Sequence, residues 1–204
     1  DTVTSLGGVP VNIDVWGADA VYSGTQKCLS CPPGLSPMTF SDRAVQATLD
    51  RETPVQSWLL DLSLVASYWQ GDAKSGARTY HHTAPVNTLM GLHEALRRIV
   101  QEGLENVWAR HKAASDIIVA GMEEMGFSML VDANIRLPEL LTITLPEGID
   151  DAAVRGKLLN DHGIEISAGL GPFAGKLWRI GVMGEGARPE NAERVLRAIK
   201  ALIS

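Results

Sequence analysis

Lys27 is a residue of this sequence whose type and position suit covalent chemistry. It follows Gly24-Thr25-Gln26 and an apolar strand-like segment, and the loop after it, Cys31-Pro32-Pro33-Gly34, can continue neither a strand nor a helix. A lysine at the end of a buried strand loses part of its hydration, which lowers its pKa and makes its amine a nucleophile toward an aldehyde. An ordinary surface lysine in a turn has the same spacing, so both interpretations stay open on spacing alone.

Arg179 is a second candidate, because it lies in the strand-like run Leu177-Trp178-Arg179-Ile180-Gly181-Val182. Trp178, Ile180 and Val182 alternate on one face, which places Arg179 on the other. A guanidinium among apolar residues needs an anion, and a carboxylate that accepts two parallel hydrogen bonds is the natural match. A substrate carboxylate and an internal Asp or Glu satisfy this need equally well.

A polar cluster, Tyr80-His81-His82-Thr83, lies between a polar loop (Gly71 to Ala77) and the start of a helix. Hydroxyls and backbone amides near a helix N-terminus bind anions, although capping and ordinary hydrogen bonding fit the cluster as well. Adjacent histidines in an extended backbone point to opposite sides, so this pair is a poor metal site.

The only cysteines, Cys28 and Cys31, have the C-x-x-C spacing of redox centres and zinc sites. No second Cys or His pair with ligand spacing completes a tetrahedral site, so no metal is expected. The preferred interpretation is two small residues in a tight loop, and their role stays open. Gly169-Leu170-Gly171-Pro172 is too short for a dinucleotide-binding motif and indicates a backbone turn.

The elements that position these residues form an α/β pattern. Consecutive strands of one buried sheet are predicted at residues 2–6, 11–15 and 20–22, and a further strand is predicted at 35–40 after the proline loop. Asp42 is expected to cap a short helix through Leu49, and one amphipathic helix then carries Trp58, Leu62, Val65, Ala66 and Trp69. A long helix follows, with an apolar stripe of Val86, Leu89, Met90, Leu96, Ile99 and Val100.

Beyond Gly103, a second helix runs to Met125, where Gly126 fits a C-terminal cap. Strands and helices then alternate in a unit of about 100 residues, the size of a small domain. The strands are predicted at 127–131, 140–145, 164–168 and 177–182, one helix lies between an Asp150 cap and Gly163, and a last helix runs from Pro189 to Ile203.

Composition narrows the class of protein. The 204 residues are 45% hydrophobic and 21% charged, which is typical of a soluble globular protein. The net charge of −6 disfavours a nucleic-acid surface, and no apolar run reaches the roughly 20 residues of a membrane span. No signal-peptide pattern is present, so a cytoplasmic protein is expected. The start at Asp1, without an initiator Met and within a strand-like segment, suggests a cut chain.

Four motifs in this order resemble the class V pyridoxal-phosphate-dependent aminotransferases, and among them the alanine–glyoxylate and serine–glyoxylate group. The motifs are Asp1-Thr2-Val3-Thr4-Ser5-Leu6-Gly7-Gly8, Tyr22-Ser23-Gly24-Thr25-Gln26-Lys27, Tyr80-His81-His82-Thr83 and Leu177-Trp178-Arg179-Ile180-Gly181. The resemblance covers essentially the whole sequence. It implies the C-terminal half of an aspartate-aminotransferase-like α/β fold, fold type I. Residues 1–102 would form the C-terminal part of the large cofactor-binding domain, including a linker helix. Residues 103–204 would form the small C-terminal domain.

The resemblance also implies a role for each motif. Lys27 would form the Schiff base with pyridoxal phosphate and then shuttle the substrate proton as a general base. Asp1 would pair with the pyridine nitrogen and keep the ring protonated. Gln26 would contact the cofactor phosphate. Tyr80 and Thr83 would reach the phosphate held by the neighbouring subunit, which makes a homodimer the catalytic unit, and Arg179 would bind the substrate carboxylate.

The expected reaction is the transfer of an amino group from alanine or serine to glyoxylate or a related 2-oxo acid. Alternatives within the same fold are a pyridoxamine–pyruvate or aminophosphonate aminotransferase, a kynurenine-cleaving enzyme, or a desulfurase. The desulfurase is disfavoured because both cysteines lie within four residues of Lys27, rather than in the C-terminal domain.

Family members carry about as much chain again before Asp1, including a glycine-rich phosphate loop and the aromatic residue that stacks on the pyridine ring. Weak cofactor binding by this segment alone is therefore expected. A cleaved or partial chain, a second polypeptide that supplies the N-terminal half, and a truncated homologue are all consistent with the sequence. A second hypothesis, which is not an enzyme function, is a non-catalytic fragment that folds or dimerises without binding cofactor.

Overall fold

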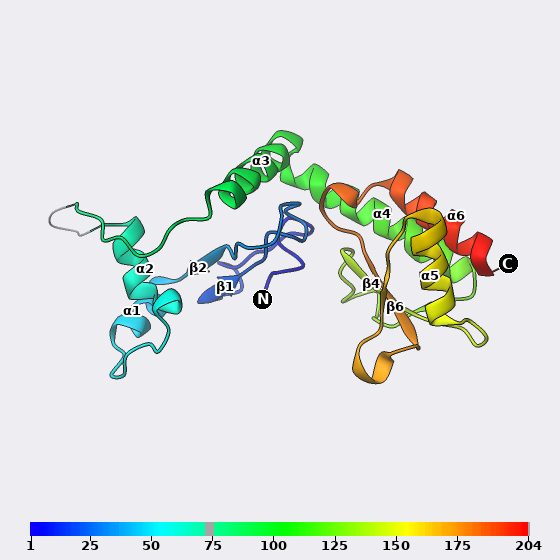
Figure 1. The fold of residues 1–204 in the computed structure, drawn as a ribbon, viewed down its shortest axis with the longest axis horizontal. Coiled ribbons are helices and arrows are strands. Elements are labelled where there is room, and N and C mark those ends of the chain that lie inside the picture. Colours follow the sequence, from blue (N-terminus) through cyan, green and yellow to red (C-terminus); the bar gives the residue numbers. More distant parts are fainter. Residues whose placement is uncertain (72–75, 204) are drawn as a thin grey trace.

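The computed structural model describes residues 1–71 and 76–203. An N-terminal group of short strands and helices and a C-terminal α/β unit lie at opposite ends of the molecule, and two long helices, α3 and α4, connect them (Figure 1). Residues 72–75 of the predicted polar loop lie outside the described residues.

The N-terminal group contains one strand pair. β1 (Ala20–Tyr22) and β2 (Met38–Phe40) are antiparallel, with Val21 opposite Thr39. The strands predicted at 2–6 and 11–15 are wrong, because both segments form turns. The N–H of Trp16 donates to the carbonyl of Asn12, which closes a local turn, and Val15 is 86% exposed. The alternation of apolar residues here therefore does not mark a buried strand.

The helices before residue 70 differ from the prediction in one cap and one break. α1 spans Asp42–Leu49 as predicted, but the residue that caps it is Ser41, whose hydroxyl accepts from the N–H of Ala44. The single amphipathic helix predicted around Trp58 to Trp69 is divided into a 3-10 helix η1 (Trp58–Leu60) and α2 (Leu62–Trp69). The break lies at Asp61, because its carboxylate accepts from the N–H of Ser63 and starts a new helix.

The two long helices are found where they are predicted. α3 spans Val86–Glu102 and α4 spans Leu104–Glu124. Gly103 separates them with a φ of +86°, a conformation that a residue with a side chain rarely adopts. Gly126, also at φ +86°, follows the end of α4 and stops the helix as predicted.

The C-terminal unit is built on an antiparallel sheet with the order β3-β4-β6-β5 within the described residues. These strands are β3 (Ser128–Met129), β4 (Leu140–Thr144), β5 (Ser167–Ala168) and β6 (Leu177–Gly181). In the central pair, Ile143 is opposite Trp178 and Leu141 is opposite Ile180, and all four side chains are buried. The predicted strands are present but shorter at their ends.

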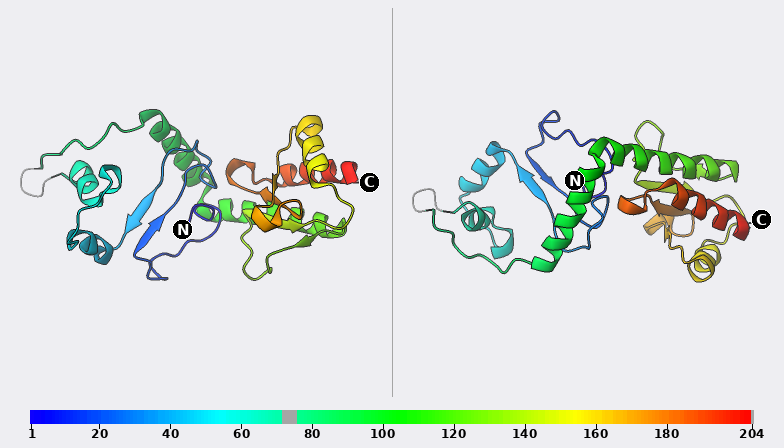
Figure 2. Two further views of the ribbon diagram at one scale, coloured as in Figure 1. Left: turned by 60° about the horizontal axis from the view of Figure 1, so that its bottom comes forward. Right: turned by 90° about the horizontal axis from the view of Figure 1, so that it is seen from above.

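Helices α4, α5 (Asp151–His162) and α6 (Pro189–Ile203) pack with this sheet (Figure 2). Their contribution to the core includes Ile118, Met122, Leu158 and Ile199. Asp150 caps α5 by accepting from the N–H of Ala153, and Gly163 ends it in the left-handed conformation, as predicted. A 3-10 helix η3 (Gly184–Gly186) joins β6 to α6 and reaches toward the N-terminal group.

Candidate active site

Lys27 lies in a tight turn held by its neighbours. The backbone N–H groups of Ser30 and Cys31 donate to the carbonyls of Lys27 and Thr25, each at 3.0 Å. The fully buried Thr25 hydroxyl donates to the carbonyl of Pro32 at 2.8 Å, which anchors the turn to the proline loop. The Lys27 side chain is half-buried, and no carboxylate among residues 1–71 and 76–203 forms an ion pair with it.

Asp1 is held by hydrogen bonds beside the end of β1, the strand that precedes Lys27 in the sequence. Its two carboxylate oxygens accept from the N–H of Val3 at 2.8 Å and from the hydroxyl of Tyr22 at 2.9 Å. Thr2 donates both its N–H and its hydroxyl to the carbonyl of Tyr22, and Ser23 donates its hydroxyl back to the carbonyl of Thr2. These bonds orient the carboxylate of Asp1 relative to the end of β1.

Gln26 is exposed beside Lys27, and its side chain lies against Gly24. A Cβ added to Gly24 would come within 2.8 Å of Gln26 Oε1, so a larger residue at position 24 would displace the amide. The glycine therefore makes room for Gln26 in the turn.

Tyr80 and Thr83 form a pair of their own. The Tyr80 hydroxyl and Thr83 Oγ1 are 2.6 Å apart on an exposed segment between α2 and α3. In Figure 1 this segment runs outside the β1–β2 pair, and no hydrogen bond within the described part of the chain joins either residue to Asp1, Gln26 or Lys27. Within the described residues of one chain, this pair is therefore not hydrogen-bonded to the Lys27 turn.

The prediction that His81 and His82 point to opposite sides is wrong. Their Nδ1 atoms are 2.8 Å apart, because His81 stacks flat on Trp58 and its Nε2 contacts the carbonyl of Trp58 at 2.9 Å. Tertiary packing therefore overrides the alternation of an extended backbone. Among the described residues, no group of three or more potential metal ligands occurs.

Arg179 lies on the face of β6 opposite Trp178 and Ile180, and is half-buried where those two are buried. Its Nε donates to the carbonyl of Ala168 at 2.9 Å, which fixes the plane of the guanidinium. In the described residues no carboxylate forms an ion pair with it, so the internal salt bridge is not observed. The outer nitrogens of the guanidinium can therefore bind a carboxylate from solution.

Cys28 and Cys31 are free, buried thiols that contact different segments. Cys28 Sγ donates to the carbonyl of Thr4 at 3.1 Å, and Cys31 Sγ lies 3.8 Å from the carbonyl of Thr88. Burial, with a further contribution from the charge of Glu139, raises the pKa of Cys28 to about 12. A redox-active thiol has a lowered pKa, so the surroundings of Cys28 disfavour the reactive thiolate.

Several residues near Lys27 are not predicted by the sequence motifs. Ser30, the only non-glycine residue with a positive φ in the described chain, accepts from the N–H of Glu185 at 2.6 Å. His111 is buried and accepts from the N–H of Gly184 at 2.9 Å. His111 continues an apolar stripe of α4 with Val107, Ala114 and Ile118, and a histidine in such a stripe is the signal that identifies it.

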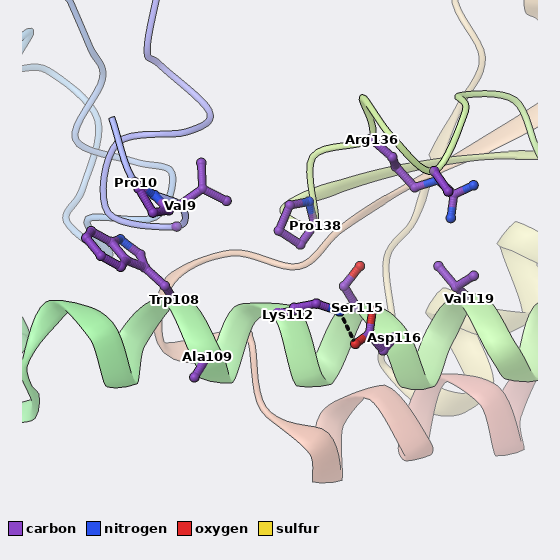
Figure 3. Close-up of a pocket in the computed structure, with 12 residues that line it drawn as sticks. Val9, Pro10, Trp108, Ala109, Lys112, Ser115, Asp116, Val119, Arg136 and Pro138 are labelled. Atoms are coloured by element: carbon purple, nitrogen blue, oxygen red, sulfur yellow. Dashed lines mark hydrogen bonds and ion pairs between the residues drawn. The ribbon is translucent and has the colours of Figure 1, made fainter. Parts of the chain in front are cut away.

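A cavity of about 490 Å³ lies between residues 8–10, α4 and the segment before β4 (Figure 3). Val9, Pro10 and Trp108 form one side, and the Lys112–Asp116 ion pair lies along α4. None of the predicted site residues lines this cavity. It is therefore separate from the Lys27 turn.

Comparison with known proteins finds relatives that match nearly the full length of this chain. The family model described as aminotransferase class-V matches residues 1–175. The alanine–glyoxylate aminotransferase of Rattus norvegicus is 41% identical over 201 residues, which are 98% of this chain and 48% of that protein. The (S)-ureidoglycine–glyoxylate transaminase of Bacillus subtilis is 37% identical over 221 residues, and the match covers 100% of this chain and 52% of that protein.

A solved structure has the same fold. The crystal structure of an alanine–glyoxylate aminotransferase from Nostoc sp. superposes with a TM-score of 0.93 at 46% identity, covering 100% of this chain and 53% of the other. The chain therefore has the mixed α/β, fold type I architecture predicted for it, and it spans about half the length of the curated relatives it matches. Within the described residues no helix has the length and apolar character to cross a bilayer.

Proposed function

Because the chain belongs to the class-V aminotransferase family, we propose that the complete protein transfers an amino group between a small amino acid and glyoxylate or a related 2-oxo acid, with pyridoxal phosphate as cofactor. Glyoxylate occurs in the names of both relatives described above, which supports it as the acceptor. Alanine or serine is the proposed donor. A ureidoglycine-like donor is the second candidate, because the transaminase of Bacillus subtilis covers the whole chain.

The observation that carries this proposal is the arrangement of Asp1 and Lys27. The carboxylate of Asp1 is oriented by two hydrogen bonds, and hydrogen bonds of Thr2 join its segment to Tyr22 and Ser23 at the end of β1. Lys27 follows Ser23 by four residues, and its amine has no ion-pair partner in the described chain. A pyridine aldehyde needs this donor set, an acid for its ring nitrogen and an amine for its aldehyde carbon. The residues present therefore fit pyridoxal phosphate.

When bound, pyridoxal phosphate supplies a protonated ring that withdraws electrons from the substrate α-carbon. Asp1 would keep the proton on the ring nitrogen. Lys27 would hold the cofactor through its Nζ, and once the substrate amine replaces it, the freed amine would take the α-proton and return it. Gln26 would orient the phosphate. Arg179 would bind the carboxylate of the amino acid and of the 2-oxo acid in turn.

We further propose a homodimer in which Tyr80 and Thr83 reach the cofactor phosphate of the partner subunit. Their support is the short contact between two exposed hydroxyls that do not contact the Lys27 turn of their own chain. The division into residues 1–102 and 103–204 is likewise proposed. The remaining phosphate ligands would come from an N-terminal part like that of the relatives, on the same or a second polypeptide, since the match covers about half of them.

The test is to identify the lysine that reacts. Pyridoxal phosphate is added to the protein, the visible absorption band is recorded, borohydride is added, and the pyridoxyl-labelled peptide is mapped. We expect the label on Lys27 and its loss in Lys27→Ala. Lys112→Ala is the matched control, because Lys112 pairs with Asp116 on the exposed face of α4. A label on another lysine in an active preparation would contradict the proposal.

The same sample separates the enzyme from a non-catalytic fragment. Intact mass shows whether an N-terminal polypeptide accompanies the 204 residues. We expect the label and transamination of alanine with glyoxylate when such a part is present. A preparation that contains both halves and shows neither would support the fragment hypothesis.

A further inference from the structure

We propose that Ser30 and His111 are positioning residues: they hold the loop Met183–Ala187, and with it the end of β6, against the turn that carries Lys27. Neither residue is proposed to touch substrate or cofactor. The inference rests on the roles proposed above for Lys27 and Arg179. It concerns how these two groups, 152 positions apart in sequence, are kept at a fixed separation.

The loop Met183–Ala187 continues directly from the strand of Arg179. The N–H of Val182 donates to the carbonyl of Glu139 at 2.8 Å, so the sheet pairing extends one residue beyond β6. Gly184 is five positions after Arg179. In Figure 1 the chain after β6 crosses from the C-terminal unit to the junction of α3 and α4. A displacement of this loop is therefore transmitted to the end of β6.

On its other side the loop contacts the Lys27 turn. The N–H of Glu185 donates to Ser30 Oγ at 2.6 Å. A Cβ added to Gly184 would overlap Ser30 Oγ and would come within 3.2 Å of the carbonyl oxygen of Lys27. Ser30 N–H donates to that same carbonyl. Ser30 therefore links the loop to the backbone of Lys27.

His111 fixes the loop from α4. Its Nε2 accepts from the N–H of Gly184 at 2.9 Å, which leaves Nδ1 to carry the hydrogen and donate to the carbonyl of Val107 at 2.7 Å. Burial lowers the pKa of His111, which favours the neutral imidazole. Arg110 adds two hydrogen bonds, to the carbonyls of Gly184 and Ala187, each at 2.8 Å, and its charge is paired with Glu102.

On its α3 side the loop is held by the Arg98–Glu185 ion pair at 3.1 Å rather than by close packing. A cavity of about 210 Å³ lies between α3 and the loop, lined in part by Ser30, Ala95, Ile99, Gly184 and Glu185. Removing a hydrogen bond therefore leaves the loop space to move. Because misplacing a binding group by about 1 Å can slow a reaction about a hundredfold, a small shift of Arg179 relative to Lys27 is sufficient to matter.

The test is a double-mutant cycle in the complete, cofactor-loaded protein. If Ser30 acts through Arg179, Ser30→Ala lowers kcat/KM by about tenfold or more in the wild-type background and by little in the Arg179→Gln background. Ser30→Gly should give a similar loss, because glycine adopts the positive φ without strain and still lacks the hydroxyl. Ser41→Ala is the matched control, since it removes a helix-capping hydroxyl far from the loop.

Hydrogen exchange provides a readout that does not need activity. Ser30→Ala should speed exchange of the amides of Gly184 and Glu185, whereas Ser41→Ala should leave them unchanged. Equal losses from Ser30→Ala in both backgrounds, or unchanged exchange of the loop, would overturn the inference. If the wild-type protein neither labels at Lys27 nor transaminates, the proposed function fails instead, and hydrogen exchange still decides whether Ser30 holds the loop.

Discussion

The hydroxyl of Tyr22 donates a hydrogen bond to Asp1 Oδ2, and the two residues are twenty-one positions apart. The second oxygen of Asp1 accepts from the backbone N–H of Val3. The carboxylate therefore has one fixed partner from the backbone and one that a substitution can remove.

This relationship predicts a graded effect on catalysis. Asp1→Asn should lower kcat by at least about a hundredfold with a smaller change in cofactor affinity, because it removes the charge that keeps the ring protonated. Tyr22→Phe should lower kcat by about tenfold, the size expected for one hydrogen bond to a charged group. Steady-state kinetics with a cofactor titration measure both effects. A larger effect from Tyr22→Phe than from Asp1→Asn would contradict the assignment.

Arg179→Lys tests whether Arg179 binds the carboxylate of both the amino acid and the 2-oxo acid. The ammonium keeps the charge but loses the planar fork, so KM for the amino acid and for the 2-oxo acid should both rise about tenfold or more. Labelling of Lys27 by pyridoxal phosphate and borohydride should be unchanged. Arg155→Lys, which keeps its ion pair with Asp151, is the matched control. A rise in KM for only one of the two substrates would show that Arg179 does not serve both half-reactions.

Glu139 should make stability depend on pH. It is fully buried, neither carboxylate oxygen has a hydrogen-bond partner in the described residues, and burial raises its pKa to about 7 from an ordinary value of 4.5. Between these values the unfolded chain releases a proton that the folded chain keeps. The free energy of unfolding should therefore fall by up to about 3 kcal/mol as pH rises from about 4.5 to 7.

Denaturant unfolding at a series of pH values checks this. Glu139→Gln should remove the loss of stability in that window, whereas Glu193→Gln, an exposed residue of α6, should leave the profile unchanged. An unaltered slope in Glu139→Gln would show that another group titrates there.

Gly8→Ala should destabilise the contact between the N-terminal group and the C-terminal unit. The added Cβ would overlap the carboxyl group of Glu139 and come within 2.8 Å of Cys28 Sγ. Overpacking of this kind costs about 1–3 kcal/mol. Gly156→Ala is the control, because nothing lies within 4 Å of its added Cβ in α5, and it should stabilise the helix by about 0.5–1 kcal/mol. Similar melting temperatures for the two variants would contradict the packing described for Gly8.

The C-terminal unit was predictable because its signals are local. Asp150, Gly163 and Pro189 stand at the helix ends where caps and first turns belong, and the strands between them alternate over a single core. The strands predicted at 2–6 and 11–15 failed because alternation cannot show whether a neighbouring strand exists. Without one, the backbone of these segments bonds to itself in turns.

The candidate site was predictable only in part, for a related reason. Arg179 follows from alternation within one strand. In contrast, the contact of Ser30 with Glu185 joins residues 155 positions apart, and that of His111 with Gly184 joins residues 73 apart. No local pattern contains such pairs. The facing of His81 and His82 likewise depends on the stacking of His81 on Trp58, 23 positions away.

The two buried thiols on either side of Leu29 and Ser30 are natural probes of how often the segment around Lys27 opens. Cys28 and Cys31 are 1% and 5% exposed, and the protonated Cys28 is a poor nucleophile while the turn is closed. An alkylating reagent can therefore reach these sulfurs only when the segment around Lys27 opens. The rate of alkylation would report how often this segment opens, and the measurement needs no cofactor, substrate or introduced probe.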